Sequence, residues 1–280
     1  MATLKKEFQA PDPVYGLAVL DKKLYVLRKR QSEQIYVYDT KDYKLQHTIN
    51  VDGLAPNCYN DLTECKAEKC LFVSDYNAKC IRKIDAKGVA SKFVDLSYEP
   101  KGLSITPEGH LLVSCNPSKL LELCVKTGEK VAQVKLMLDV NCPKHAVKRK
   151  DGQYVVCHAE ETSHLSRVVR VGTDGFFRHC FGGIEGKGND QLNTPCHLAL
   201  RDDNYVIVVD NNNNRLVLLD QSLEYVDTLL DMKEPHRVWF DSETSLLYVG
   251  ECTDSGTVKV YEIKKWKESS GKKGKEWKWG

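Results

Sequence analysis

Long apolar runs are absent from this chain of 280 residues. No segment approaches the roughly eighteen consecutive apolar residues that a membrane-spanning helix needs, so no membrane association is expected. The first residues, Met1 to Phe8, contain no apolar core of a secretory signal. The sequence therefore predicts a cytoplasmic protein.

Closely paired cysteines are also absent. The chain has eleven cysteines but no C-x-x-C pair, which zinc ribbons and RING fingers require. Some lie within apolar runs, as Cys157 does in YVVCHA, where a free thiol behaves as a small apolar side chain. We expect reduced and mostly buried cysteines rather than a disulfide framework.

The common catalytic signatures are missing as well. There is no G-x-S-x-G elbow, no G-x-G-x-x-G turn that leads into a helix, and no G-x-x-x-x-G-K-[ST] loop. Their absence excludes nucleophile-elbow, dinucleotide-binding and P-loop chemistry. No cofactor is expected.

An excess of either charge is missing, since 41 basic and 39 acidic residues leave a net charge of +2. That total indicates no class of partner. It conceals an asymmetry, because residues 264–280 hold seven lysines against Glu268 and Glu276, whereas residues 1–263 are slightly acidic. This segment, with tryptophans between its lysines, is predicted to be a disordered basic tail.

What the chain has is an internal repeat. Six prolines are spaced by 43, 44, 43, 52 and 40 residues: Pro13, Pro56, Pro100, Pro143, Pro195 and Pro235. After each proline come short apolar runs rich in Val, Ile, Leu and Tyr, separated by polar turns such as PEGH and RDDN. Four antiparallel strands repeated six times predict an all-β, six-bladed β-propeller.

The last repeat lacks a fourth strand after Glu262, whereas Leu4 to Phe8 precede Pro13 as a fourth strand precedes each other proline. We therefore expect the N-terminal strand to complete the last blade and close the ring. The expected blades of this single, monomeric domain (residues 1–263) are 13–52, 53–96, 97–139, 140–181, 182–231, and 232–263 together with 3–9.

One unit, residues 181–220, begins with Phe-Gly-Gly and carries Asp-x-x-x-Asn-Arg from Asp210 to Arg215. It resembles an NHL repeat. The second unit keeps Asp75 and Asp85 ten residues apart, although Cys80 replaces the arginine. The resemblance covers residues 1–263, strongly in one unit. It implies a non-catalytic binding platform like the C-terminal domain of TRIM-NHL proteins, which bind RNA or protein, whereas no RING, B-box or coiled coil is present.

By the geometry of that family, the loops before the first strand and between the second and third strands share one rim. We predict RNA or a protein as the partner of this rim, with neither favoured. The alternative is that its lysines simply solvate the loops. The predicted binding residues are Arg28, Lys29, Arg30, Tyr59, Lys79, Lys101, Lys119, Lys144, His145, His197, Arg215 and Arg237.

An enzyme is the alternative to this platform. His145 and His197 lie two positions after a repeat proline, Cys58 occupies the matching place in the second unit, and His236 lies one position after its proline. Three imidazoles at the channel mouth could hold a zinc ion with an open position, as implied by analogy with the six-bladed peptidyl-hydroxyglycine amidating lyase. Against this, His236 is one residue out of phase, which turns a strand residue to the other face.

Overall fold

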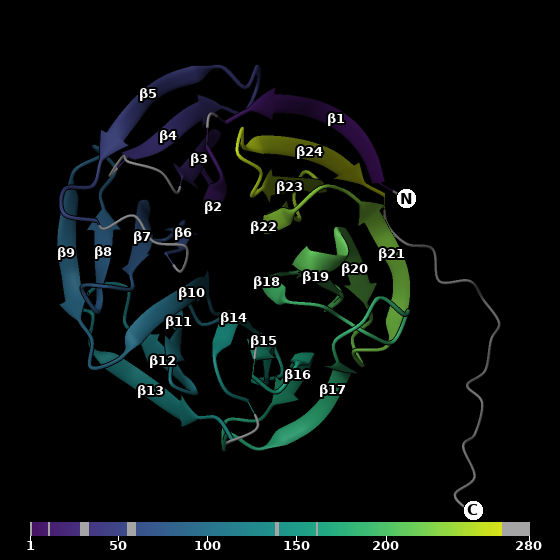
Figure 1. Cartoon of the computed structure of the whole chain (residues 1–280). Helices are drawn as coiled ribbons and strands as arrows, with labels where there is room; N and C mark the ends of the chain where they lie inside the picture. The colour runs from purple at the N-terminus through teal and green to yellow at the C-terminus, as the bar shows by residue number, and fades with distance from the viewer. Residues whose placement is uncertain are drawn as a thin grey trace, which may run out of the picture.

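The computed structural model describes residues 2–10, 12–28, 34–54, 60–137, 140–160 and 162–264. These residues form six four-stranded antiparallel sheets arranged as a ring (Figure 1). Residues from the first strands of all six sheets line a central channel. In the described ranges the one helical element is a 3-10 turn, η1 (Asn211–Asn213). The predicted six-bladed, all-β propeller is confirmed.

Within each of the first five blades the strands follow in chain order from the channel outward. The first three blades contain β2 (Val14–Leu20), β3 (Lys23–Arg28), β4 (Gln34–Asp39) and β5 (Leu45–Asn50), then β6 (Leu62–Cys65), β7 (Cys70–Asp75), β8 (Cys80–Ile84) and β9 (Ala90–Asp95), then β10 (Glu99–Ile105), β11 (Leu111–Asn116), β12 (Lys119–Leu123) and β13 (Lys130–Lys135). The next two contain β14 (Pro143–Lys148), β15 (Tyr154–Glu160), β16 (Leu165–Val171) and β17 (Phe177–Ile184), then β18 (Pro195–Leu200), β19 (Val206–Asp210), β20 (Arg215–Leu219) and β21 (Tyr225–Asp231).

The sixth blade closes the ring. It consists of β22 (Pro235–Asp241), β23 (Leu246–Glu251), β24 (Thr257–Ile263) and the N-terminal strand β1 (Ala2–Gln9), which pairs antiparallel with β24. The pairing runs from Ala2 opposite Ile263 to Gln9 opposite Thr257, so the two ends of the propeller fasten each other (Figure 1). The predicted closure is confirmed.

The core lies between neighbouring blades, and this explains the apolar runs of the sequence. Both faces of an inner strand pack against other blades, so β7 and β19 are buried at every residue, whereas the outer strand β5 is exposed at most of its positions. Strands covered on both faces read as continuous apolar runs rather than as alternating ones. None of the helical structure among the described residues has the length or apolar character to cross a bilayer.

The NHL-like motif anchors the loop that enters its own blade. Arg215 donates from Nε to Asp210 Oδ2 at 2.7 Å and from Nη2 to the carbonyls of Gly188 and Gln191 at 3.0 and 2.8 Å. In the second blade Arg82 makes the same contacts, to Asp75 Oδ2 at 2.9 Å and to the carbonyl of Gly53 at 2.9 Å. The arginine replaced at Cys80 is therefore supplied two residues later, on the same face of β8.

Candidate functional site

Each blade contributes one residue to a common layer across the channel, from its first strand or, in the second blade, from the position just before it. Three of these positions are fixed by strand register, with His145 opposite Cys157, His197 opposite Val209 and Arg237 opposite Gly250. The carbonyl of Asp61 accepts the amide hydrogen of Ser74, which places Asp61 at the same level in the second blade. We call the six residues the channel layer: Gly16, Asp61, Gly102, His145, His197 and Arg237.

The two glycines leave room for the other four side chains. A Cβ atom at Gly102 would lie 2.6 Å from His145 Cα and 2.8 Å from His145 Cδ2, and one at Gly16 would lie 2.7 Å from Leu62 Cβ. Real Cβ atoms do not approach so closely, because such contacts are strongly repulsive. The polar side chains therefore converge because two blades contribute only backbone to the layer.

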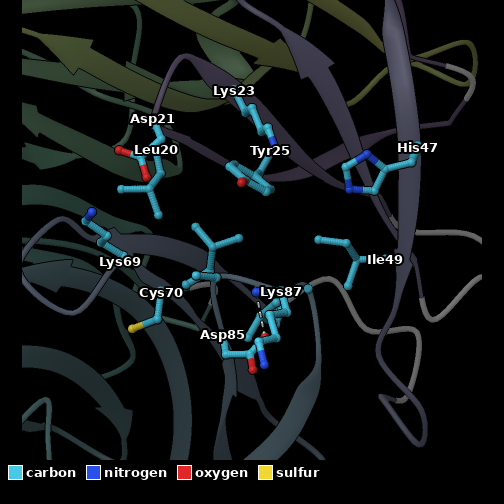
Figure 2. Close-up of a pocket in the computed structure, with 14 residues that line it drawn as sticks. Leu20, Asp21, Lys23, Tyr25, His47, Ile49, Lys69, Cys70, Asp85 and Lys87 are labelled. Atoms are coloured by element: carbon cyan, nitrogen blue, oxygen red, sulfur yellow. Dashed lines mark hydrogen bonds between the residues drawn. The ribbon is translucent and has the colours of Figure 1, made fainter.

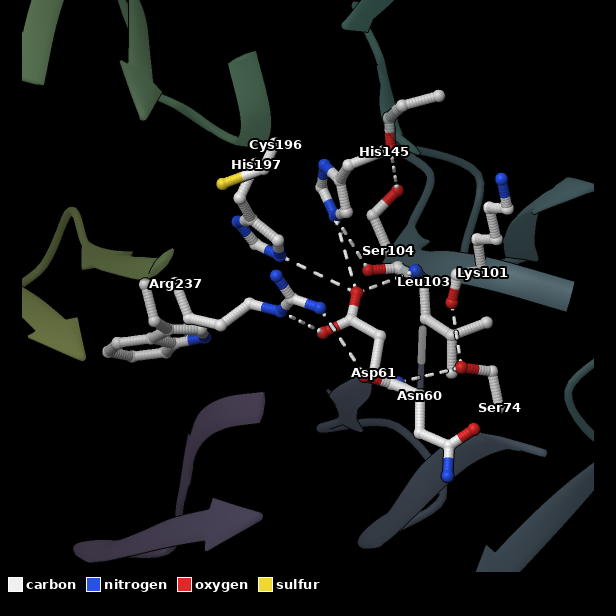
Figure 3. A network of polar contacts seen from close by, with 12 residues as sticks. Asn60, Asp61, Ser74, Lys101, Leu103, Ser104, His145, Cys196, His197 and Arg237 are labelled. Carbon is white, nitrogen blue, oxygen red and sulfur yellow. Dashed lines mark hydrogen bonds and ion pairs between the residues drawn. The ribbon is translucent and has the colours of Figure 1, made fainter. Parts of the chain in front are cut away.

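Asp61 is the centre of the layer (Figure 3). Its Oδ1 accepts a hydrogen bond from Arg237 Nε at 3.2 Å, and its Oδ2 accepts one from the Leu103 amide at 2.9 Å. Oδ2 also lies 3.5 Å from His197 Nε2 and 3.9 Å from His145 Nε2. Asp61 is fully buried, and the other three side-chain-bearing residues of the layer are between 2% and 7% exposed.

Backbone contacts hold this arrangement in place. The Asp61 amide donates to Ser74 Oγ at 2.7 Å, and that hydroxyl donates to the carbonyl of Lys101, also at 2.7 Å. Arg237 Nη2 reaches the carbonyl of Asn60 at 3.3 Å, so the arginine grips both the side chain of Asp61 and the chain that precedes it. The orientation of the carboxylate is therefore set before any ligand arrives.

The charges of the layer are also fixed. Burial opposes ionisation of Asp61, but the neighbouring His197 and Arg237 outweigh it and hold the pKa of the carboxyl well below its usual range. Burial lowers the pKa of His145 to about 3, with His197 adding to the effect, and burial likewise lowers the pKa of His197. At neutral pH the layer thus combines one carboxylate, one guanidinium and two neutral imidazoles.

Both imidazoles of the layer have one ring nitrogen without a hydrogen-bond partner among the described residues. The Nδ1 atoms of His145 and His197 are buried and make no hydrogen bond to any described residue. Ligand atoms of Asp61, His145 and His197 all lie within 4.8 Å of one another. Two imidazoles and one carboxylate are a common donor set for divalent metals.

The distances allow such an ion. Ligands at about 2.1 Å from a tetrahedral ion are about 3.4 Å apart, compared with the 3.5 and 3.9 Å that separate Asp61 Oδ2 from the two Nε2 atoms. His145 Nε2 lies 2.9 Å from the carbonyl of Leu103, a hydrogen bond that metal binding would have to replace, because a metal-bound Nε2 carries no hydrogen to donate. These two separations fit a divalent ion after a contraction of a few tenths of an ångström, and the ligand atoms of all three residues lie within 4.8 Å of one another.

His236 lies outside this centre. Its Nδ1 is 2.9 Å from the carbonyl of Val14, and its ring packs edge-on against Tyr15 with a centroid separation of 4.4 Å. Arg237 occupies the position that corresponds to His145 and His197. The predicted three-histidine set is therefore corrected to two histidines and an aspartate, because the side chain one residue out of phase points elsewhere.

Asp61 was missed because the repeat was aligned on its prolines. Pro56 and Cys58 lie outside the described residues, and the chain between Pro56 and the layer is longer than in the other blades. Alignment on the NHL-like aspartates places Asp61 fourteen residues before Asp75, close to the thirteen that separate His197 from Asp210. This similar spacing is the sequence signal that would have indicated Asp61.

The structure disperses the other predicted binding residues. Lys29, Arg30 and Tyr59 lie outside the described residues. Arg28 is buried, with Nη1 3.3 Å from Asp12 Oδ2, and its guanidinium stacks on Tyr36. Lys101 is buried, and Arg215 is held by Asp210 in the blade-entry contacts described above.

The remaining lysines of the rim are more accessible. Lys79 pairs with Glu99 at 3.2 Å, and Lys119 lies over the ring of Tyr98. Lys144, next to His145, is half-buried and engaged in a contact of its own. Most of the predicted cationic groups therefore already hold internal partners. An RNA or protein partner, the monomeric state and the cytoplasmic location stay predictions.

A small chamber lies in the channel on the side of the layer toward which the first strands end. It has a volume of about 190 Å³, and its wall comes from the first strands of all six blades. His145 and His197 belong to this wall together with Glu64, Lys148 and Trp239, amid mostly apolar neighbours. The chamber gives a small molecule access to the face of the candidate centre.

A second hollow lies between the first two blades, away from the channel (Figure 2). It measures about 220 Å³, and its lining includes Tyr25, His47 and Ile49. The side chain of Asp85, in its lining, accepts hydrogen bonds from the amides of Lys87 and Val89 as part of a turn. This groove brings no buried polar groups together and is not the candidate site.

The solved structures similar to this chain include enzymes. Virginiamycin B lyase from Staphylococcus aureus gives a TM-score of 0.65 at 14% identity, covering 94% of this chain and 100% of the lyase. A catalytically inactive variant of that lyase, with a histidine replaced by alanine and with quinupristin, gives 0.64 at 16% identity, covering 94% and 100%. The Cps50 (Swd1) propeller domain of Myceliophteria thermophila gives 0.61 at 14% identity, covering 90% of this chain and 84% of that one. No family model and no curated protein matches the sequence.

At this identity the similarity shows the propeller fold, and it does not favour TRIM-NHL proteins. The similar lyases nevertheless contradict the prediction that this chain is not an enzyme. Lyases share the fold over almost the whole chain, so this architecture is compatible with catalysis. Missing sequence motifs did not exclude an enzyme, because a propeller assembles its site from separate blades.

Proposed function

We propose that this chain is a metal-dependent propeller enzyme whose centre is Asp61, His145 and His197. One observation carries the proposal: three metal-binding side chains from three different blades converge in the channel, with their ligand atoms within 4.8 Å of one another. Burying an ionised carboxylate is costly unless it is paired. Ring closure does not require such a group, since apolar residues would fill the channel at lower cost.

The centre suits Lewis-acid or water-activating chemistry. Three protein ligands leave one position of a tetrahedral ion for water or for a substrate oxygen. A divalent ion held by these three residues would supply polarisation of a bound carbonyl or a lowered pKa of a bound water. Arg237 would keep Asp61 ionised and oriented through the contact between Nε and Oδ1. Because this guanidinium also offsets the carboxylate charge, we expect weaker affinity than at a centre with several free carboxylates.

The similar lyases support an enzymatic role for a propeller of this kind. One of them lost catalysis when a single histidine was replaced by alanine, and it was solved with quinupristin. We therefore propose an elimination or hydrolysis that requires His145 and His197, and take virginiamycin B as the first substrate to test. A recognition role for the rim is compatible with catalysis in the channel.

Metal binding is tested first. Chelator-treated protein is titrated with Zn²⁺ or Mn²⁺ and its thermal unfolding is followed. At an ion concentration about 100 times Kd, stabilisation is about 2.7 kcal/mol, which corresponds to a rise in Tm of roughly 5–10 °C for a chain of this size. Asp61→Asn and His197→Gln should lose the rise. His179→Gln, on the outer strand β17, is the matched control and should keep it.

Turnover is tested with virginiamycin B and with 4-nitrophenyl acetate, followed by mass spectrometry and absorbance. We expect metal-dependent conversion of at least one of them, reduced 100-fold or more in His197→Gln. A wild-type chain that is not stabilised by either ion contradicts the metal centre. Turnover that His197→Gln leaves intact contradicts catalysis at the channel layer.

A further inference from the structure

Glu64 lies in the same chamber as the two histidines of the channel layer. We propose that Glu64 is the proton-transfer residue of this chamber, exchanging a proton with a substrate whose reacting part, small and largely apolar, is held between it and the Asp61, His145 and His197 centre. This inference rests on the proposed function and extends it by naming the acid–base group and the kind of substrate.

The carboxyl of Glu64 is held in a defined position. Trp239 Nε1 donates a hydrogen bond to Glu64 Oε2 at 2.9 Å. The bond joins β6 of the second blade to β22 of the sixth, passing the first strand of the blade between them. Among the described residues that line the chamber, Glu64 is the one that carries a carboxyl group. An oriented acid facing a small cavity is what proton transfer to a bound molecule requires.

The charged groups around Glu64 leave it without a dominant ionic partner. Lys148, also on the chamber wall, directs its ammonium to Glu122 Oε1 at 2.9 Å and Glu108 Oε2 at 3.2 Å. Lys66 favours the ionised form of Glu64 and Asp241 opposes it. The two histidines of the wall are neutral at pH 7, as derived above.

Burial is consequently the largest influence on this carboxyl, and it raises the pKa of Glu64 to about 7. A group that titrates near the working pH is present in useful amounts as both acid and base. Glu64 can therefore gain or lose its proton near pH 7 while Asp61 stays ionised. The chamber thus contains one carboxylate fixed in charge and one carboxyl that can gain or lose a proton.

The proposed reaction passes one proton through Glu64 and changes no oxidation state. The Glu64 carboxylate accepts the proton of a water or hydroxyl group in the chamber as that oxygen forms its bond to the substrate. The resulting carboxylic acid then gives the proton to the oxygen that leaves as the substrate bond breaks. Glu64 ends the turnover in the state in which it began, and no further reactant is needed.

The chamber also restricts the substrate. Its wall includes Leu103, Val147 and Leu198, and its volume of about 190 Å³ accommodates only a small group. At the end away from the channel layer, Ile105, Leu200 and Phe240 are partly exposed, which indicates where that group enters. An uncharged ester with a compact apolar end fits this lining better than a charged molecule.

The test uses the hydrogen bond to Trp239 as a reporter. The chain has four tryptophans, and the other three are Trp266, Trp277 and Trp279. Replacing those three with phenylalanine leaves Trp239 as the single tryptophan in the full chain. We expect its fluorescence to change with a midpoint near pH 7, because its indole donates to a group that changes charge. Glu64→Gln should abolish the transition, and Lys66→Gln should move the midpoint upward.

Activity on 4-nitrophenyl acetate gives the second readout. Glu64→Gln should keep the stabilisation by Zn²⁺ or Mn²⁺ but lose about 10²- to 10⁴-fold in turnover, together with the inflection near pH 7 in its pH profile. The proposal is overturned if Trp239 shows no transition between pH 6 and 8. It is equally overturned if Glu64→Gln turns over as fast as wild type. If Zn²⁺ and Mn²⁺ do not stabilise the wild-type chain but turnover still depends on Glu64, the metal centre is refuted and the role of Glu64 in proton transfer is supported.

Discussion

The pairing of Asp61 with Arg237 makes a prediction whose size follows from the structure. Arg237→Met removes the guanidinium 3.2 Å from Asp61 Oδ1 and preserves much of the side-chain volume. Both residues are buried, Asp61 completely and Arg237 to all but 6% of its surface. Removing one partner of a buried pair leaves an uncompensated charge, which costs about 3–5 kcal/mol. We expect that loss in the free energy of unfolding at pH 7.5.

The loss should depend on pH. In wild type, the depressed pKa of Asp61 contributes stability that is complete above the unfolded value of about 3.9 and is lost only as the pH falls through the lower folded value. Without Arg237, burial raises the pKa of this carboxyl, so the variant regains stability as acid protonates it. His197, 3.5 Å away, can take up a compensating charge at low pH and acts in the same direction. The deficit should therefore shrink from pH 7.5 to pH 5.

Urea denaturation at pH 5, 6 and 7.5 measures these differences. Arg178→Met is the control, because Arg178 and Asp174 form an exposed pair that should contribute about 0.2–1 kcal/mol at every pH. The double variant Asp61→Leu and Arg237→Met should recover most of the stability, since it removes both buried charges. A deficit below 1 kcal/mol for Arg237→Met, or one that does not change with pH, would refute the assignment of Asp61 as an ionised carboxylate dependent on Arg237.

Two further predictions concern closure and packing. Deleting residues 1–9 removes β1 and leaves the edge of β24 unpaired, so Tm should fall by about 6–12 °C for a loss near 3 kcal/mol, measured by calorimetry. Deleting residues 265–280 is the control, and equal Tm values for the two deletions would contradict ring closure. Gly102→Ala should cost about 1–3 kcal/mol and abolish metal stabilisation, because its Cβ would meet His145 Cα at 2.6 Å. Gly183→Ala, which has open space, is its control, and an unaltered metal response in Gly102→Ala would argue against the tight layer.

The fold was predictable because the propeller repeats simple physical requirements. Each inner strand packs on both faces, so runs such as the buried VIVVD of β19 recur at a regular distance from a proline. A ring also cannot leave an open edge, which made the unpaired segment from Leu4 to Phe8 the natural partner of the last blade. Neither inference needed the position of any individual side chain.

The site was only partly predictable because it depends on register. Counting from Pro143 and Pro195 found His145 and His197, since the chain makes the same bulge after both prolines. Counting from Pro235 indicates Arg237 rather than His236, and the structure agrees. Asp61 escaped because it lies five residues after Pro56, whereas the layer residues found by this count lie two residues after their prolines.

The fate of the basic residues could not be read from the sequence at all. Arg215 has its carboxylate partner five residues earlier, across a tight turn, whereas Arg237 finds Asp61 at a separation of 176 residues. In the sequence, Arg215 and Arg237 both look like arginines in loops near the rim. Only the ring closure that brings the second and sixth blades together across the channel decides which one is buried and which carboxylate it meets.

Comparison of two adjacent levels of the same strands separates function from packing. One residue beyond the channel layer, the six equivalent positions are all apolar and all buried: Leu17, Leu62, Leu103, Ala146, Leu198 and Val238. At that level every blade packs an aliphatic side chain into the apolar clusters between blades. In the channel layer it instead has two glycines, an aspartate, two histidines and an arginine, an arrangement that packing alone would disfavour. Because stability does not account for this departure, the channel layer is the part of the repeat that most needs a chemical explanation.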